Sequence, residues 1–558
     1  MERFAAAGDG AVIRPPFHCD YRKAPSQSGR GGYCLRGFFE ADDCGRIRGG
    51  ATAGTNESAS GNVAVSRRAT GMKVLQSRYG WQAQKGLWLG RNGLAMALCI
   101  VVVLGVGLRA YALDFQSLWT DEISSLMITD PTLPFHQFWD RVLADTHPPI
   151  YYLVLRWSSS AFGQSEIVAR APSVLFGILT VCAAGVLPGA SLSRSSRVAL
   201  PLLLAVSPGA VWYAREARSY ALLLLLSTVI TVACIRSLRC TPHEDGEARG
   251  ALTMLTMAAL LASFTHYFGV LLSMAAFFTC FLLVDSRHRA IVVLSGCGIA
   301  ALFLPWVVYH SRFITSEQAT WIGELSVAAS IDWFKHLAFG GTASLIVFIG
   351  AVVAVLATVG WRSSVALNST IGACALLCLL TLAAAATISL HTPILTSRNM
   401  IVVLPAIYVI AAELTSWLMR RWGTIVGATY LVLQIGLMCQ ALTAYYTIDI
   451  NEQWRDSAAL VLGTPGCASG DIRVYGDASN YRFFTRSVRP NLQLIEIPWG
   501  AAADLGNEPT TTSCPIVLWI VGVAPWDLDH LLDRLGLSRS SSEVAEYHSA
   551  YVIFRKHP

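Results

Sequence analysis

The sequence predicts an α-helical polytopic membrane protein that ends in a small α/β domain. Of its 558 residues, 54% are hydrophobic and only 14% are charged, whereas about a quarter of the residues of a soluble domain carry a charge. Long apolar runs recur through the middle of the chain, and runs of this kind are typical of membrane-spanning helices. The formal charge of +6 is spread over the loops, so we do not expect nucleic-acid binding.

The first part of the chain is rich in Gly, Ser, Arg and Ala and shows no sustained periodicity. We interpret residues 1–91 as a disordered cytoplasmic tail. Met72 begins a basic stretch that leads into an apolar helix, so the sequence leaves open whether the chain starts at Met1 or at Met72. The helix predicted at 93–113 is too long for a signal peptide and no small-residue cleavage site follows it, so we expect a retained anchor.

About eleven apolar stretches are predicted to cross the membrane, in a domain at residues 92–445. They are 93–113, 168–190, 198–212, 220–235, 251–265, 269–284, 290–308, 344–360, 371–390, 401–418 and 423–442. Arginines lie in every second loop, as the positive-inside rule expects of cytoplasmic loops. These are Arg91, Arg194, Arg197, Arg236, Arg239, Arg287, Arg289, Arg362, Arg420 and Arg421. With the N-terminus inside, the odd number of stretches places the C-terminal region outside.

That C-terminal region, residues 446–558, is predicted to be a soluble α/β domain on the periplasmic side. Short β-type runs alternate with polar helical stretches, at 471–477, 515–522 and 549–556 for the runs and at 454–463 and 528–536 for the helices. Of the 14 cysteines, only Cys467 and Cys514 lie in a polar region that could be oxidising, where they could form a disulfide. The cysteines show no metal-binding spacing.

The first outer loop, 114–167, carries two adjacent acids, Asp121 and Glu122, in the stretch LWTDEISSLM. No basic residue lies within five positions on either side. The loop continues with DTHPPIYYLVLRW, which contains His147, Tyr151 and Tyr152. The proline pair and the aromatic residues of this stretch indicate an interfacial segment that does not span the membrane.

Later outer loops carry the cations. The cations are Arg215 and Arg218 in REARSY, His266 in THYF and Arg398 in LTSRNM. Glu216, Tyr220 and Tyr267 accompany them in the same stretches. The positive-inside rule places arginines mainly on the cytoplasmic side, so arginines on the outer face need another explanation. A guanidinium group is well suited to binding phosphate. Carboxylates in one loop and cations in others, all on one face, indicate a functional site.

Each of these residues also has a structural interpretation. The acidic pair could cap and charge the first turn of an interfacial helix. The neighbours Arg215 and Glu216 could form a structural ion pair. The aromatic residues fit an interfacial belt, and His266 fits a satisfied interfacial histidine.

Five stretches together resemble the GT-C membrane glycosyltransferases, in particular the protein O-mannosyltransferases and aminoarabinose transferases that use polyprenyl-phosphate sugars. They are LWTDEISSLM, HPPIYYLVLRW, ARAPSVLFGIL, REARSYALLLL and THYFGVLL. The resemblance covers roughly residues 93–442 and is most specific in the first half. It implies a GT-C fold and an inverting transfer of a sugar from a polyprenyl-phosphate donor to a hydroxyl of a lipid, glycan or protein acceptor. The active site would lie at the periplasmic face of the inner membrane.

The resemblance also implies roles for individual residues. Asp121 is the expected general base, and Glu122 is a supporting acid or a metal contact. His147 lies where some relatives carry a lysine near the donor phosphate. The remaining candidates for substrate binding are Tyr151, Tyr152, Arg215, Glu216, Arg218, Tyr220, His266, Tyr267 and Arg398. We expect no required cofactor, and a divalent metal stays open because two acids are too few ligands to define a site.

The chemistry agrees with this assignment. A lipid-phosphate sugar carries its own leaving group, and an inverting displacement needs a base for the acceptor and positive charge at the departing phosphate. We therefore expect the acidic pair to lack a protein partner because its partner is the acceptor hydroxyl.

Three other classes stay open: a transporter or flippase of lipid-linked sugars, a glycan polymerase or ligase, and a non-catalytic membrane scaffold. A transporter would bury its charges near the middle of the membrane, often in repeated halves. A polymerase would carry its site in a late outer loop. The charges here lie at outer helix ends and the acids in the first outer loop, which favours the transferase.

Overall fold

The computed structural model describes residues 91–240, 244–313, 326–359 and 369–463, together with parts of 472–555. The tail 1–90, including Met72, lies outside the described residues. So do Cys467 and Cys514, and with them the disulfide expected between them.

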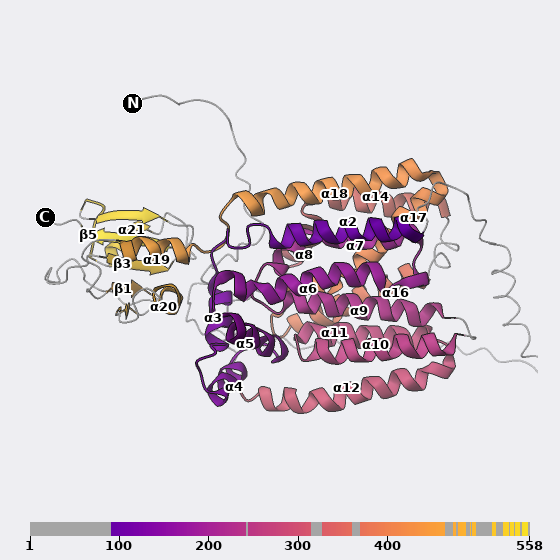
Figure 1. Cartoon of the computed structure of the whole chain (residues 1–558), viewed down its shortest axis with the longest axis horizontal. Coiled ribbons are helices and arrows are strands. Elements are labelled where there is room, and N and C mark those ends of the chain that lie inside the picture. Colours follow the sequence, from indigo (N-terminus) through magenta and orange to yellow (C-terminus); the bar gives the residue numbers. More distant parts are fainter. Residues whose placement is uncertain are drawn as a thin grey trace, which may run out of the picture. The chain divides into compact units, whose positions relative to one another are not determined.

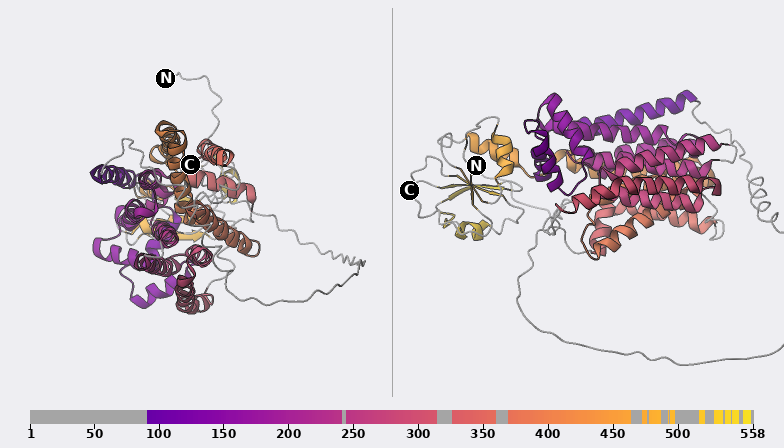
Figure 2. Two further views of the ribbon diagram at one scale, coloured as in Figure 1. Left: turned by 90° about the vertical axis from the view of Figure 1, so that its right-hand side faces the viewer. Right: turned by 90° about the horizontal axis from the view of Figure 1, so that it is seen from below.

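Helices run side by side in one bundle, and each predicted membrane stretch coincides with one of them or with a helix pair (Figures 1 and 2). In chain order they are α2 (Arg91–Ala110), α6 (Glu166–Val186), α7 (Arg194–Val206), α8 (Pro208–Ala214), α9 (Tyr220–Arg239), α10 (Asp245–Ser263), α11 (Tyr267–Leu283), α12 (Arg289–His310), α13 (Val327–Phe339), α14 (Thr342–Val359), α16 (Ser369–Ser389), α17 (Leu404–Trp422) and α18 (Thr424–Thr447). The chain is a multi-pass helical membrane protein.

Fewer of these helices are long and apolar enough to cross a membrane than the eleven expected. Among the described residues seven single helices meet this standard, or nine spans if the bent pairs α7–α8 and α13–α14 each count as one. α11 has only 17 residues, and α10 begins with the charged residues Asp245, Glu247 and Arg249. The sequence count is too high because apolar stretches of about 15 residues were accepted, whereas about 20 residues are needed to span.

Capping and glycine geometry explain where the two bent pairs break. The Ser207 hydroxyl accepts from the backbone N–H of Ala210, and Pro208 occupies the first turn of α8, where its missing N–H leaves no bond unmade. α7 and α8 meet at 57°. At the 85° bend between α13 and α14, Gly340 has a φ of 73° and a Cβ there would lie 2.5 Å from that of Ala441. Only glycine fits this position without strain.

Three short helices lie together at one end of the bundle (Figure 1). They are α3 (Thr120–Ile128), α4 (Phe135–Ala144) and α5 (Ile150–Phe162). α5 has 13 residues, too few to cross about 30 Å of hydrocarbon, so the aromatic stretch does not span, as expected. We call this end of the bundle the loop end.

Two arginines of the predicted cytoplasmic loops form hydrogen bonds with residues at the ends of other helices. Arg236 near the end of α9 donates to the carbonyl of Leu187 after α6 at 3.3 Å. Arg239 donates to the hydroxyl of Thr370 at the start of α16, at 2.8 Å. The alternating pattern of arginines therefore corresponds to helix ends that lie side by side.

α9 and α17 are the most buried helices of the bundle, and their N-terminal ends lie at the loop end. In the most apolar 18-residue part of each helix, 78% of α9 and 89% of the η4–α17 helix are buried inside the protein. The corresponding shares are only 17% for α2 and 11% for α12. Arg218 lies two residues before α9, and Arg398 directly precedes η4 (Asn399–Val403), which leads into α17. Side chains placed on such constrained elements can be held in a fixed geometry.

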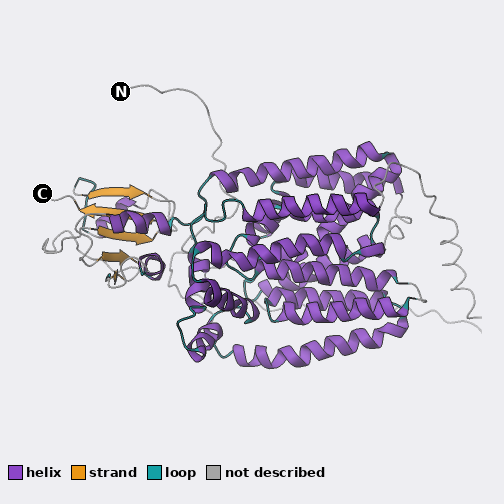
Figure 3. Cartoon of the chain, in the orientation of Figure 1, coloured by secondary structure: helices purple, strands orange, loops and turns teal. Residues whose placement is uncertain are grey.

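The C-terminal residues form a five-stranded sheet with three helices (Figure 3). The strands are β1 (Ile472–Tyr475), β2 (Leu494–Ile497), β3 (Ile516–Ile520), β4 (Ser542–Glu546) and β5 (Ala550–Arg555), in the order β2-β1-β3-β5-β4. β1 runs parallel to β2 and β3, whereas β5 is antiparallel to β3 and β4. The helices are α19 (Trp454–Gly463), α20 (Ser479–Thr485) and α21 (Leu528–Arg534).

The predicted elements of this region are confirmed, but they are incomplete. The three predicted strand runs correspond to β1, β3 and β5, and the two predicted helices to α19 and α21. β2, β4 and α20 were not predicted. Each of these has only four to seven residues, too few for a periodic pattern to stand out.

Candidate functional site

Asp121 and Glu122 occupy the first turn of α3 at the loop end. The backbone N–H of Trp119 donates to Glu122 at 3.3 Å. The backbone N–H of Thr120 donates to the carboxylate of Glu452 at 2.8 Å, and the Thr120 hydroxyl donates to the same oxygen. Carboxylates at a helix N-terminus satisfy free N–H groups and favour the helix dipole. The capping interpretation of the acidic pair therefore holds for Glu122.

Glu122 is fully buried against Arg170 of α6. The Nε and Nη2 of Arg170 donate to the two carboxylate oxygens at 2.9 and 2.7 Å, and the backbone N–H of Ala217 donates to Oε1 at 2.8 Å. Arg170 also donates to three carbonyls of the chain leading into α3, those of Leu113, Gln116 and Ser117. Glu122 and Arg170 therefore tie α3, α6 and the connection before α9 together.

Asp121 lies in different surroundings. Its side chain is 30% exposed, its Oδ2 accepts from Nη1 of Arg398, and Nη2 of Arg218 lies 3.9 Å from the same oxygen. The Arg398 guanidinium is held 4.4 Å over the ring of Trp119, a favourable cation–π geometry. Burial raises the pKa of the Asp121 carboxyl, but the two arginines outweigh this effect and the net pKa is lowered.

The expectation that the acidic pair lacks a protein partner is therefore wrong. The partners, Arg170, Arg218 and Arg398, lie 48 or more positions away in the sequence. Folding brings α6 and the segments before α9 and α17 against α3. The absence of basic residues nearby in the sequence gave no indication of this.

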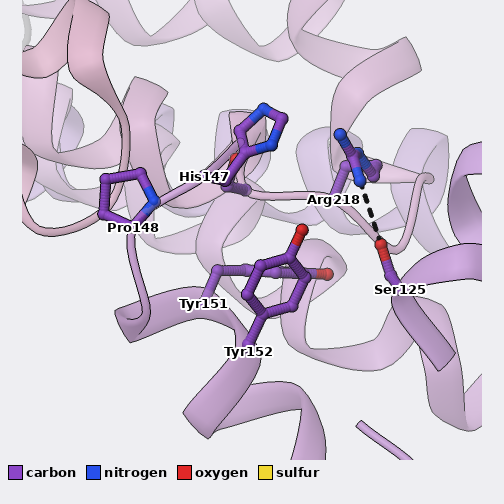
Figure 4. Close-up of a pocket in the computed structure, with 7 residues that line it drawn as sticks. Ser125, His147, Pro148, Tyr151, Tyr152 and Arg218 are labelled. Carbon is purple, nitrogen blue, oxygen red and sulfur yellow. Dashed lines mark hydrogen bonds between the residues drawn. The ribbon is translucent and has the colours of Figure 1, made fainter. Parts of the chain in front are cut away.

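Arg218 lies at the edge of a narrow pocket, whose empty space including its open mouth is about 170 Å³. Figure 4 shows the side chains of His147 and Arg218 across the pocket from Tyr151 and Tyr152. The complete lining is Ser125, His147, Pro148, Tyr151, Tyr152, Arg218 and Ser219. Pockets for whole ligands usually have roughly 300–1,000 Å³, so a sugar phosphate would enter only if the lining moves.

Two contacts define the position of Arg218 in this pocket. Its Nη1 donates to the hydroxyl of Ser125 at 3.2 Å. Its Nε is buried and has no hydrogen-bond partner among the described residues. Arg218 therefore keeps a donor that no described residue uses.

His147, which lines the pocket, is paired with Asp145, which does not. The Nδ1 of His147 lies 2.9 Å from Oδ1 of Asp145, and the hydroxyl of Tyr152 donates to that oxygen at 2.7 Å. Burial raises the pKa of the Asp145 carboxyl, but the hydrogen bond from His147 and its charge outweigh burial, and the pKa lies well below its usual range. A carboxylate only accepts hydrogen bonds, so Nδ1 of His147 carries a proton.

His266 packs against His147 behind the pocket. The two ring centroids are 5.1 Å apart, and Tyr220 lies 5.6 Å from His266 on another side. Nδ1 of His266 accepts from the backbone N–H of Phe268 and so caps α11. Burial, together with the charges of His147 and Arg218, lowers the pKa of His266 well below its usual range. His266 is therefore a neutral, satisfied histidine next to the pocket.

Like Tyr152, two further aromatic residues predicted to bind substrate make internal hydrogen bonds. The hydroxyl of Tyr151 lies 2.9 Å from that of Ser173, so Tyr151 contributes its ring to the pocket wall. The hydroxyl of Tyr267 lies 2.6 Å from Nδ1 of His310. Tyr267 is not among the residues that line the pocket.

Arg215 is not brought to the pocket. It donates to carbonyls at the C-terminal end of α2, those of Leu108, Arg109, Tyr111 and Ala112. Its guanidinium also lies 5.1 and 5.0 Å from the rings of Tyr445 and Tyr446. A cation that binds free carbonyls at a helix C-terminus stabilises the helix, so the geometry favours a structural role.

Glu216 does not form the ion pair with Arg215 that the sequence left open, as far as the described residues show. Its Oε1 accepts from the indole N–H of Trp212 at 2.5 Å, and its Oε2 is buried without a hydrogen-bond partner. Burial and the neighbouring Glu122 raise the pKa of the Glu216 carboxyl to about 8. Glu216 is therefore protonated at neutral pH, which explains how it is buried without a cation.

The sequence interpretation missed four residues that organise the site: Ser125, Arg170, Asp145 and His310. Arg170 was visible as a charged residue inside an apolar stretch, which usually marks a specific partner. Asp145 was visible two positions before His147. Nothing in the sequence pointed to Ser125 or His310 as site residues, because serines and histidines are common in helices.

The arrangement suits an anionic ligand with a base beside it. Arg218 and His147 line a pocket at the loop end. Asp121 lies beside Arg218 and binds Arg398, and Asp145 binds His147. Among the described residues, no group of three or more His, Cys, Asp or Glu side chains is placed to hold a metal ion. Asp121 and Glu122 instead bind separate arginines.

No protein-family model matches the sequence, and no curated protein matches it either. Solved structures do match in fold. ArnT from Cupriavidus metallidurans in the apo state superposes with a TM-score of 0.50 at 13% identity, over 87% of this chain and 98% of that chain. The same protein bound to undecaprenyl phosphate gives 0.49 at 13% identity, over the same shares of both chains. The oligosaccharyltransferase of Archaeoglobus fulgidus in the apo form gives 0.48 at 10% identity, over 82% of this chain and 74% of that chain. The likeness to apo ArnT concerns the fold alone, and it confirms the predicted GT-C type of fold.

Proposed function

We propose that this protein is a membrane glycosyltransferase that transfers a sugar from a polyprenyl-phosphate donor to an acceptor hydroxyl. The site would lie at the extracytoplasmic face of the inner membrane, with the C-terminal α/β domain on the same side. The observation that carries the proposal is the placement of Asp121 beside Arg398 and Arg218, because Arg218 also lines a pocket together with His147. ArnT, whose apo structure shares this fold, has also been solved with undecaprenyl phosphate bound, which supports the donor class.

In this mechanism Asp121 takes the proton of the acceptor hydroxyl. The acceptor oxygen attacks the anomeric carbon, the bond from that carbon to the phosphate oxygen breaks, and the electron pair leaves with the polyprenyl phosphate. Attack opposite the leaving group inverts the anomeric configuration. Arg218 and His147 stabilise the charge that develops on the phosphate. A base of this kind usually contributes about 10²–10⁴-fold to the rate.

The arginines around Asp121 have a consequence for its strength as a base. Arg398 and Arg218 keep the carboxylate ionised, but a carboxylate with a lowered pKa accepts a proton less readily. Nη2 of Arg218 is 3.9 Å from Asp121, a contact longer than a hydrogen bond. When Arg218 turns toward the donor phosphate, Asp121 loses part of this stabilisation and becomes more basic. Donor binding would then prepare the base.

We assign catalysis to Asp121 and not to Glu122. Glu122 is 0% exposed, and both of its oxygens accept hydrogen bonds from Arg170. A carboxylate committed in this way positions α3 and has no access to an acceptor. Arg398 holds Asp121 in place, and Arg215 stabilises the end of α2.

The test is transfer of radiolabelled sugar from undecaprenyl-phosphate-linked hexoses and pentoses to membrane acceptors. We compare the wild type with Asp121→Asn, and use Asp140→Asn as the matched control because Asp140 is exposed on α4 in the same outer loop. We expect Asp121→Asn to lose at least about 10²-fold in rate, whereas the control keeps its activity.

Each other outcome has a defined meaning. Equal transfer by the wild type and Asp121→Asn would retain the enzyme class but place the base elsewhere. No transfer by the wild type with any donor would count against the proposal and favour a transporter of lipid-linked sugars.

A further inference from the structure

Glu452 lies in the connection between α18 and α19, far in the sequence from the outer loop that carries Asp121. Its Oε2 accepts from the backbone N–H of Thr120 at 2.8 Å and from the hydroxyl of the same residue. The indole N–H of Trp454 donates to the same oxygen at 2.6 Å. Three donors therefore meet at one carboxylate oxygen, and two of them belong to the first residue of α3.

This contact replaces the cap that α3 lacks. The N–H of Thr120 is one of the first four of the helix, which have no partner within it. An N-cap side chain usually accepts from such a group, but the N-cap here is Trp119, whose side chain makes no capping hydrogen bond because an indole only donates. Glu452 supplies from another part of the chain the carboxylate that a helix N-terminus favours. α3 has only nine residues, fewer than the about 12–15 that an isolated helix needs, so it depends on such contacts.

The segment that leads into α3 is held by the same connection. Gln116 is 1% exposed, and its Nε2 donates to the carbonyls of Tyr445 and Ile448 at 3.1 and 2.7 Å. Its Oε1 accepts from the backbone N–H groups of Ile450 and Asn451 at 3.0 and 3.1 Å. Further hydrogen bonds run from Asn451 to the carbonyl of Ser117 and from Arg455 to those of Asp114 and Phe115. The end of α18 and the connection after it therefore fix the backbone just before α3.

Each of the first three residues of α3 is bound by a different part of the chain. The pairs are Thr120–Glu452, Asp121–Arg398 and Glu122–Arg170. The last two are described above, whereas the first has no role in the mechanism. Helices fray from their ends, so loss of the first pair would let the turn unwind at Thr120, and Asp121 is the next residue.

We infer that Glu452 is a positioning residue, which holds the first turn of α3 through Thr120 and so keeps the Asp121 carboxylate at the acceptor hydroxyl. The inference rests on the proposed function for the reaction that Asp121 performs. Glu452 acts only through α3 and touches neither substrate. A misplacement of about 1 Å can cost 10²-fold in rate, so removal of Glu452 lowers kcat and leaves donor binding unchanged.

The experiment compares Glu452→Ala and Glu452→Gln with the wild type, using the full chain. The amide oxygen of Gln can accept from the N–H of Thr120, whereas Ala offers no acceptor. Transfer of radiolabelled sugar from undecaprenyl-phosphate-linked donors gives kcat and the donor KM. We expect kcat of Glu452→Ala to fall about 10–100-fold, with the donor KM within about twofold of the wild type. Glu452→Gln should recover most of the lost rate. A rise in the donor KM with an unchanged kcat would overturn the inference.

Two controls test whether the effect passes through α3. Asp456→Asn removes an acidic charge four positions away, from a side chain that is 45% exposed and pairs with Arg455 at 3.4 Å, and it should keep its kcat. In the Asp121→Asn background, Glu452→Ala should cause no further loss of the residual rate, because the two changes act on the same group. An equal fall in Asp456→Asn, or a full further loss in the Asp121→Asn background, would overturn the inference.

Hydrogen exchange separates this inference from the proposed function, because it needs no substrate. In Glu452→Ala the amides of α3 should exchange faster, while those of α9 stay protected and the melting temperature is unchanged. Unchanged exchange in α3, or faster exchange throughout the bundle, would overturn the inference. Faster exchange confined to α3, with no transfer by the wild type from any donor, would retain Glu452 as the residue that holds Asp121 and would remove the proposed function.

Discussion

Two regions of the loop end use the same residue types for different purposes. We call Glu122, Arg170 and Arg215 the scaffold region, and Asp121, His147 and Arg218 the pocket region. In the scaffold region the Glu122–Arg170 pair is 0% and 1% exposed, and its hydrogen bonds go to other parts of the protein. In the pocket region Asp121 is 30% exposed, and Nε of Arg218 has no hydrogen-bond partner in the part of the chain that the structure describes.

The comparison shows that neighbours in the sequence can belong to different regions. Asp121 and Glu122 are adjacent, but α3 directs one toward Arg398 and the other toward Arg170. Arg215 and Arg218 are three positions apart, but one binds carbonyls of α2 and the other reaches the pocket. The charged groups of the scaffold region are paired within the protein, whereas Nε of Arg218 in the pocket region has no hydrogen-bond partner among the described residues.

The largest effect is expected from breaking the scaffold region at Glu122. Glu122→Leu leaves the buried Arg170 without its counter-charge, which typically costs about 3–5 kcal/mol. We expect a large drop in the melting temperature of the purified protein. The double variant Glu122→Leu/Arg170→Met should cost less than the sum of the two single variants, since it leaves no unpaired charge. Loss of transfer with an unchanged melting temperature would contradict this and assign Glu122 to catalysis.

A smaller effect should separate the two arginines. Arg215→Met removes charged hydrogen bonds to the end of α2, each worth about 1.5–3 kcal/mol, so it should lower the melting temperature and leave the donor KM of the folded protein unchanged. Arg218→Met should raise the donor KM more than the acceptor KM, with a smaller change in melting temperature. An equal or larger rise in the acceptor KM would remove Arg218 from the phosphate site.

The smallest effect concerns Glu216, which belongs to neither region. Its pKa is raised to about 8 in the folded protein, so between its ordinary range and pH 8 the folded state holds a proton that the unfolded state has released. Stability therefore falls as the pH rises through this window. Glu216→Gln has nearly the shape of the protonated acid and should remove this dependence.

When the pH rises from 5 to 6, we expect the free energy of unfolding of Glu216→Gln to increase by about 1 kcal/mol relative to that of the wild type. The measurement is the melting temperature of both proteins at the two pH values. Parallel changes in the two proteins would show that Glu216 is ionised when folded.

Much of the fold could be predicted from local features. Apolar runs located the helices, and β-type runs located β1, β3 and β5, because burial in lipid or in a sheet requires a composition that can be seen in a short window. The count of spans was too high because a window cannot tell a short buried helix from a complete crossing. β2 and β4 were missed because strands of four or five residues leave little pattern.

The sequence by itself determined that this chain is a helical membrane protein and that its acids, arginines and histidines collect at one set of helix ends. Only the tertiary structure decided which of these side chains are paired within the protein and which could still bind a ligand. Arg170 neutralises Glu122 from 48 positions away, and Asp145 pairs with His147 while its carbonyl binds His310 of α12. Burial, pairing and protonation depend on neighbours in space, and the sequence order of Asp121 and Glu122 or of Arg215 and Arg218 contains no information about those neighbours.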